Sequence, residues 1–67
     1  MFEGYDGKKF QLVDKDGKKF EVGDKVKNTV ISGIFAPHKP SSSGKIRVNG
    51  TLYYPSVFEL KFEEVRS

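Results

Sequence analysis

Residues 45–52 read Lys-Ile-Arg-Val-Asn-Gly-Thr-Leu, and this stretch decides the fold. In its first half, apolar side chains alternate with basic ones, which is typical of a β-strand with one face on the core and the other in water. The Asn49-Gly50 pair favours a two-residue type I′ turn, because both central residues of that turn have positive φ. The stretch therefore predicts a β-hairpin over about residues 45–54.

The same alternation recurs in residues 9–12 and 19–22, with Asp16-Gly17 between them. This pair predicts a second hairpin over about residues 9–22, again with a tight type I′ turn. The alternation breaks near Asn28, where we expect a bulge or a strong bend. Apolar residues nowhere recur at helical spacing without interruption, so no helix longer than one turn is predicted.

Two further segments complete the predicted order of elements. Two prolines and three serines between residues 36 and 44 predict one long loop, taken as residues 35–44. Pro55 cannot donate to a strand ladder, so a single 3₁₀ turn is expected there, placing Val57 and Phe58 on the core. A last strand follows, from Phe58 to about Val65.

These elements predict an all-β fold, a small antiparallel barrel of five or six strands that spans residues 1–67 as one domain. Whether residues 1–7 pair with the sheet or fray is left open. The expected core comprises Phe10, Leu12, Phe20, Val22, Val26, Val30, Ile46, Val48, Leu52, Tyr54, Val57, Leu60 and Phe62, with Phe58 joining them.

Composition narrows the cellular setting. The chain has no cysteine, which fits a reducing compartment. Its N-terminus carries charged side chains in place of an apolar run, and no apolar stretch approaches the length of a membrane span. A soluble, cytoplasmic protein without a membrane anchor is therefore expected.

Several motifs resemble those of known families. Gly23-Asp24-x-Val26 at a strand entry, and Gly44-Lys45-x-x-Val48 after a variable loop, resemble SH3-like barrels of the KOW, Tudor and related types. Residues 13–27 are similar to the opening of YopX-like phage and prophage proteins, and residues 37–45 and 53–58 resemble small phage-encoded proteins. The resemblance implies an SH3-like barrel acting in the cytoplasm of a host cell. It does not select a function, because this fold serves nucleic-acid, peptide and structural roles alike.

No constellation for catalysis or cofactor binding is present. His38 is the only histidine, so neither a zinc site nor a catalytic triad can be assembled around it. Ser41 to Lys45 lacks the first glycine and the final serine or threonine of a phosphate-binding loop. Glu63 and Glu64 are neighbours on a strand and point to opposite faces. We expect a non-catalytic protein without cofactor or metal.

Charge is the main functional signal. Residues 8–47 hold ten basic side chains against four acidic ones. If neighbouring strands bring the outward cations together, they form a basic face that can displace counterions from the phosphates of DNA or RNA. The alternative is that these side chains keep a small barrel in solution and protect its edges. The predicted nucleic-acid contacts are Lys18, Lys19, Lys25, Lys27, Lys45 and Arg47.

A second hypothesis is a protein-interaction module. The 35–44 loop and one sheet edge would then bind a host or phage protein, for instance by adding a strand to it. Candidate partner contacts are Phe35, His38, Lys39 and Tyr53.

Overall fold

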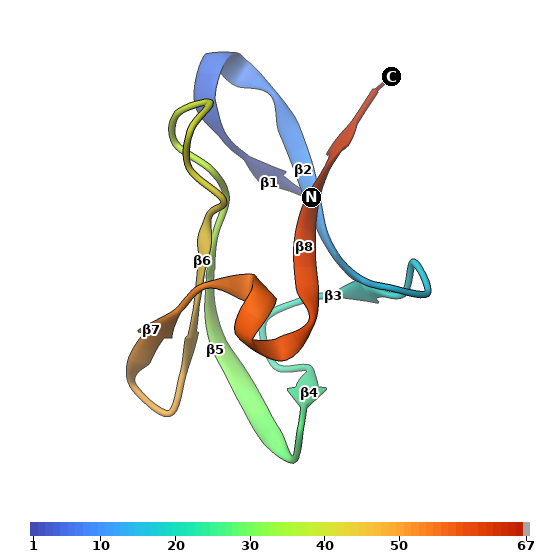
Figure 1. The fold of residues 1–67 in the computed structure, drawn as a ribbon, viewed down its shortest axis with the longest axis vertical. Coiled ribbons are helices and arrows are strands. Elements are labelled where there is room, and N and C mark those ends of the chain that lie inside the picture. The colour runs from blue at the N-terminus through green and yellow to red at the C-terminus, as the bar shows by residue number, and fades with distance from the viewer. Residues whose placement is uncertain (67) are drawn as a thin grey trace.

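The computed structural model describes residues 1–66, which consist of short strands, turns and two single-turn 3₁₀ helices (Figure 1). The predicted all-β class is confirmed. In chain order the elements are β1 (Phe2–Glu3), η1 (Tyr5–Gly7), β2 (Lys9–Asp14), β3 (Lys19–Phe20), β4 (Lys25–Val26), β5 (Thr29–Phe35), β6 (Lys45–Val48), β7 (Thr51–Tyr53), η2 (Pro55–Phe58) and β8 (Leu60–Val65).

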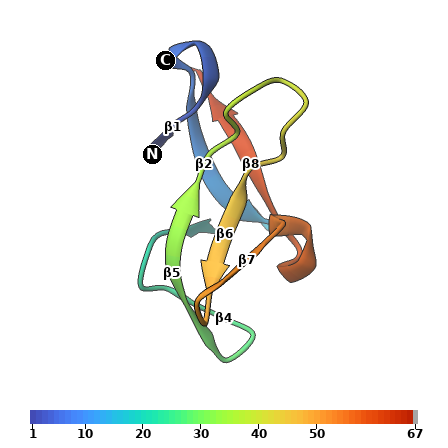
Figure 2. The same ribbon diagram turned by 90° about the vertical axis from the view of Figure 1, so that its left-hand side faces the viewer.

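The strands form two antiparallel sheets. In the first sheet, β8 pairs along one edge of β2, while β1 and β3 share its other edge. The second sheet has the order β4-β5-β6-β7. Figure 2 shows β5, β6 and β7 in front of β2 and β8. The prediction of a closed barrel of five or six strands is not met within residues 1–66, because the two ladders remain separate.

The core lies between the two sheets. Leu12 on the first sheet and Ile46 on the second are completely buried in this core. The partly buried rings of Phe58 and Phe62 pack against the buried core residues. Of the predicted core residues, seven are buried: Phe10, Leu12, Phe20, Val26, Ile46, Val48 and Leu60.

Two tight turns set the register of the second sheet. Asn49 and Gly50 have φ of 53° and 78°, and the turn pairs Val48 with Thr51, as the type I′ prediction requires. Lys27 and Asn28 also have positive φ, 47° and 65°, and join β4 to β5. The bulge or bend expected near Asn28 is therefore a two-residue turn. The irregularity of β5 lies further along, between residues 31 and 33.

This register corrects three core predictions. Val26 and Val48, each the last residue before a two-residue turn, point inward. The residue that pairs with each of them on the other side of the turn lies on the same face of the sheet. The next residue along that strand therefore points outward. Val30, Leu52 and Tyr54, all expected in the core, are consequently 46%, 47% and 59% exposed.

Ile31 and Tyr53 take the inward positions instead. Ile31 is fully buried opposite Val48, and Tyr53 pairs with Ile46 and packs on the core. Val13 is also buried although it was not expected to be. It lies between Lys19 and Lys61 on the neighbouring strands, whose aliphatic stems can cover it.

Two other core predictions fail because the backbone turns. β3 ends at Phe20, and Asp24 Oδ2 then accepts a hydrogen bond from Glu21 N at 2.7 Å. Val22 lies within this turn and is exposed. The predicted 3₁₀ turn is confirmed as η2, but only Phe58 packs on the core, whereas Val57 is exposed.

The hairpin of β2 and β3 is present with a longer turn than predicted. Gly17 N donates to Asp14 O at 3.0 Å, and Gly17 has φ of 82°. Asp14 Oδ1 accepts from the N of Asp16 at 2.8 Å and of Lys18 at 2.9 Å. A type I turn with a following glycine bulge replaces the type I′ turn, since the Asp14 carboxylate organises the wider loop.

The N-terminal segment is attached to the body of the protein, which answers the open question about residues 1–7. Phe2 pairs with Phe10 in the first sheet. Tyr5 N donates to Pro37 O at 3.0 Å, so η1 also holds the long loop. That loop begins after Phe35, which is the last residue of β5.

Gly44 ends the loop at a point of close contact between the sheets. It is buried with φ of 78°. A Cβ at this position would lie 2.5 Å from Phe62 Cε2 and 2.8 Å from Phe35 O. Glycine is required here both for its backbone conformation and for the space it leaves to the Phe62 ring.

Replacing Gly44 with alanine is expected to lower the free energy of unfolding by about 2–4 kcal/mol, from left-handed strain and overpacking together. Urea denaturation at constant m-value measures this. The matched control is Gly50→Ala, which has the same φ of 78° but no atom within 4 Å of the new Cβ. It should cost only about 1–2 kcal/mol. Equal losses in the two variants would contradict the packing role of Gly44.

Candidate nucleic-acid interface

Charge divides between the two sheets. Residues 25–58, which include the whole second sheet, contain five of the twelve basic side chains and no aspartate or glutamate. The other seven basic side chains share the remainder of the chain with all nine acidic ones. The positive excess of the protein therefore belongs to the second sheet and its loop.

The ion pairs follow the same division. Lys8 Nζ lies 3.8 Å from Glu64 Oε1, and Lys9 Nζ lies 3.5 Å from Glu3 Oε2. Glu3, Lys9 and Glu64 lie on strands of the first sheet, and Lys8 immediately precedes β2. Within residues 1–66, no basic side chain of the second sheet lies within 4.0 Å of a carboxylate oxygen.

The outer face of the second sheet carries cations beside exposed apolar groups. Lys45 and Arg47 point outward from β6, where they alternate with buried residues. Phe35 pairs with Lys45, and Leu52 pairs with Arg47, so each pair shares a face. We call this surface the basic–aromatic face; its residues are Lys25, Val30, Phe35, Lys45, Arg47, Leu52 and Tyr54.

The cations of this face lie over its rings. Arg47 Cζ is 5.7 Å from the centre of the Phe35 ring, and Lys45 Nζ is 6.0 Å from that of Tyr54. Cation–π contacts at exposed sites contribute about 0.5–1 kcal/mol, enough to bias the side chains toward the face. Of the seven large hydrophobic side chains exposed within residues 1–66, four lie here.

Gly33 fixes the place of the Phe35 ring. A Cβ on Gly33 would lie 3.2 Å from Phe35 Cε2 and 3.3 Å from both Phe35 Cζ and Arg47 Cβ. The ring therefore occupies the space that a side chain at position 33 would fill, next to the stem of Arg47. Arg47 O also accepts a hydrogen bond from Ser32 Oγ at 3.1 Å. The exposed Phe35 ring therefore has a defined position, which we call its seat, over Gly33 and beside Arg47.

A groove of about 230 Å³ runs between this face and the long loop. It is lined by Phe35, Ala36, His38, Ser42, Gly44, Lys45, Arg47 and Leu52. Ser42 Oγ accepts a hydrogen bond from Gly44 N at 3.2 Å, which leaves its own proton available to a ligand. Basic, aromatic and hydroxyl groups therefore meet in one concave site.

The structure separates the predicted nucleic-acid contacts. Lys45 and Arg47 lie in the groove, and Lys25 is on the same face, paired with Val30. Lys18 and Lys19 lie on the β2–β3 hairpin, on the opposite side of the molecule from β7 (Figures 1 and 2).

Lys27 turns away from the groove. Its Nζ lies 3.5 Å from Val57 O and 6.0 Å from the centre of the Phe58 ring. The six predicted side chains therefore do not form one continuous patch.

The predicted partner contacts also separate. Phe35 and His38 line the groove, while Lys39 is exposed on the loop outside it. Tyr53 faces the core, where its ring meets Phe58 edge-on with centres 5.4 Å apart. Tyr54, which the sequence reasoning assigned to the core, is the outward ring. The register of the Asn49-Gly50 turn was the signal that could have identified it.

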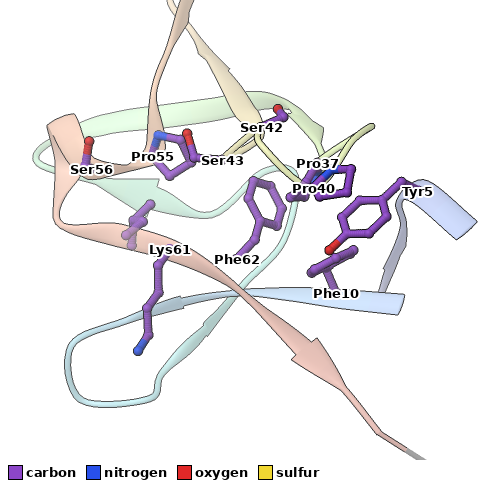
Figure 3. Close-up of a pocket in the computed structure, with 11 residues that line it drawn as sticks. Tyr5, Phe10, Pro37, Pro40, Ser42, Ser43, Pro55, Ser56, Lys61 and Phe62 are labelled. Carbon is purple, nitrogen blue, oxygen red and sulfur yellow. The ribbon is translucent and has the colours of Figure 1, made fainter. Parts of the chain in front are cut away.

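A second hollow, of about 280 Å³, lies between the long loop, η2 and β8 (Figure 3). The rings of Tyr5, Phe10 and Phe62 gather there beside Pro37 and Pro40, as Figure 3 shows. The Lys61 amine points away from these rings. The lining of this hollow is therefore mainly apolar.

Neither a metal site nor a membrane-spanning helix is found in the described part of the chain. Residues 1–66 contain no group of three or more His, Cys, Asp or Glu side chains placed to hold a metal ion. No helix among them is long and apolar enough to cross a membrane.

Comparisons of the chain with known protein families, with curated proteins and with solved structures found no match.

Replacing Gly33 with valine is expected to displace the Phe35 ring, because the new side chain needs the space the ring now occupies. Nuclear Overhauser effects between the Phe35 ring protons and Arg47 Hβ should be present in the native protein and lost in Gly33→Val. Retained effects between Ile46 and Tyr53 would show that the sheet is intact. Unchanged Phe35–Arg47 effects in the variant would refute the proposed seat.

Proposed function

We propose that this chain is a non-catalytic accessory module of the kind that phages encode, and that it contacts nucleic acid through the basic–aromatic face. One observation carries the proposal: the sheet that presents Lys45 and Arg47 beside exposed rings contains no acidic residue. Phosphates would meet cations there without a competing carboxylate on the same sheet.

The physical basis is counterion release. Each phosphate neutralised by a lysine or arginine releases condensed cations, so binding is favourable at low salt and weakens as salt rises. Cations already paired with protein carboxylates would contribute less, because binding would first have to break those pairs. Lys8 and Lys9 are paired in this way, whereas within residues 1–66 neither Lys45 nor Arg47 lies within 4.0 Å of a carboxylate oxygen.

The alternative role, keeping a small protein in solution, fits the second sheet less well. A solubilising surface intersperses both signs of charge and keeps large rings inside. The first sheet carries both signs. The second sheet has only positive charge and exposes Phe35 and Tyr54, a combination typical of binding surfaces.

At a finer level, the fold that we propose is a small SH3-like barrel of the KOW and Tudor type, open between its sheets. The strand order supports it: β5, β6 and β7 follow one another as a meander, a 3₁₀ turn comes next, and β8 returns to pair with β2. The resemblance of residues 13–27 to YopX-like proteins supports a phage origin and action in the host cytoplasm.

The two separate pairs of basic residues, Lys45 with Arg47 and Lys18 with Lys19, provide a matched test. Lys45→Glu/Arg47→Glu should weaken binding of a labelled 20-nucleotide DNA strand by about tenfold or more and reduce the slope of log K against log salt by about 1.4. Lys18→Glu/Lys19→Glu makes the same change of net charge on the opposite side and should have a much smaller effect. Fluorescence anisotropy across a salt series measures both. Equal effects of the two variants would indicate non-specific attraction and contradict the assigned face.

A second candidate is the protein-interaction module. The observation in its favour is the apolar hollow of Figure 3, which lies between the long loop and β8. Within residues 1–66, β8 pairs only with β2, so its other edge can accept a strand from a partner.

This candidate predicts a partner that is retained from host lysate after nuclease treatment. Pro40→Glu places a charge in the apolar hollow and should abolish retention, whereas Lys45→Glu/Arg47→Glu should leave it unchanged. Quantitative pull-down with the three proteins tests it. Loss of the partner on nuclease treatment would count against this function and for the nucleic-acid interface.

A further inference from the structure

The Phe35 ring is placed to do more than cover the sheet. It is 47% exposed and lines the groove, although phenylalanine has no polar atom to bring to a surface. Gly33 provides its seat, and Arg47 stands beside it. An aromatic ring that is both exposed and held in place is suited to stacking with a planar partner, because little conformational entropy is lost on contact.

The cations around the ring match a strand of phosphates. Lys45 and Arg47 are two residues apart on β6, which places their backbones about 6.8 Å apart along the strand. Both point to the face that carries Phe35. A nucleic-acid strand, which carries one phosphate and one base per nucleotide, could therefore contact both cations and the ring.

From this arrangement we infer that the basic–aromatic face takes single-stranded nucleic acid, with one base stacked on Phe35 and the adjoining phosphates at Lys45 and Arg47. The inference rests on the proposed function and specifies the class of nucleic acid. Stacking is tolerant of sequence because every base has a π-face, so binding is expected without strong base preference.

A duplex fits this surface poorly. In a duplex the base faces are covered by their neighbours, and the outside presents phosphates. The apolar side chains of Phe35 and Leu52 would then lie against charged groups that they cannot solvate. The long loop stands along one side of the groove, so a single strand could reach the Phe35 ring more readily than a double helix.

The loop wall supplies further polar groups. His38 and Ser42 line the side of the groove opposite the sheet. The Ser42 hydroxyl can donate to a phosphate or a base edge while it accepts from Gly44 N. These groups add contacts to a strand that enters the groove, and none of them requires a particular base.

Three probes test the inference: a 12-nucleotide oligo(dT), an abasic strand of equal length and charge, and a 12-base-pair duplex. The native protein should bind oligo(dT) more tightly than the other two. Phe35→Leu keeps an apolar side chain but removes the π-face. It should weaken oligo(dT) binding at least about fivefold while leaving abasic binding and the salt slope unchanged. Phe35→Tyr, the matched control, should bind as the native protein does.

Phe35→Trp gives an independent readout. The chain contains no tryptophan, so this variant has a single indole at the proposed stacking position. Its fluorescence should be quenched by oligo(dT) and unaffected by a saturating amount of the abasic strand.

The outcomes separate the two proposals. Equal binding of all three probes, with unchanged indole fluorescence, would overturn the single-strand inference and leave the nucleic-acid interface standing. If the protein bound none of the three probes at low salt, the proposed function itself would be overturned.

Discussion

Two turns in which both central residues have positive φ determine the rest of this structure. A two-residue turn of this type allows only one pairing register for the two strands that it joins. A shift of that register by one residue would exchange the two faces of the sheet. The turns at residues 27–28 and 49–50 therefore decide that Ile31 and Tyr53 pack inside. Leu52 and Tyr54 lie on the outer surface because the strand register places them there despite their apolar side chains. The candidate site is thus a product of turn geometry.

Much of the fold follows from the sequence, and the predictions that failed did so for different reasons. Alternation and turn residues predicted the β2–β3 and β6–β7 hairpins, η2 and the inward faces of β2 and β6. The failures at Val30 and Leu52 came from assigning apolar side chains to the core without counting residues across the turn. Lys27 at φ of 47° could not be expected, since lysine has no side-chain group that favours this conformation. Closure into a barrel depends on long-range pairing that local patterns do not contain.

The candidate site was only partly visible in the sequence. The excess of basic residues could be counted, but which of them gather depends on how the strands are divided between the sheets. Lys18 belongs to the β2–β3 hairpin of the first sheet, and Lys45 belongs to β6 of the second. Phe35 and His38 were predicted as partner contacts at the loop, and both line the groove. The role of Gly33 was missed. A glycine inside a strand, two residues before a phenylalanine, is the local signal for a ring seated over the backbone.

The division of charge between the sheets makes the molecule an electric dipole. A polyanion at a distance exerts a torque that turns the positive sheet toward it before any atoms touch. The carboxylates of the first sheet contribute to this orientation, because they repel the same partner when it approaches from behind. A larger fraction of the encounters with a polyanion then occurs with the positive sheet facing it. In a protein of 67 residues, the charges of the first sheet would in this way help to orient the proposed binding face of the second sheet.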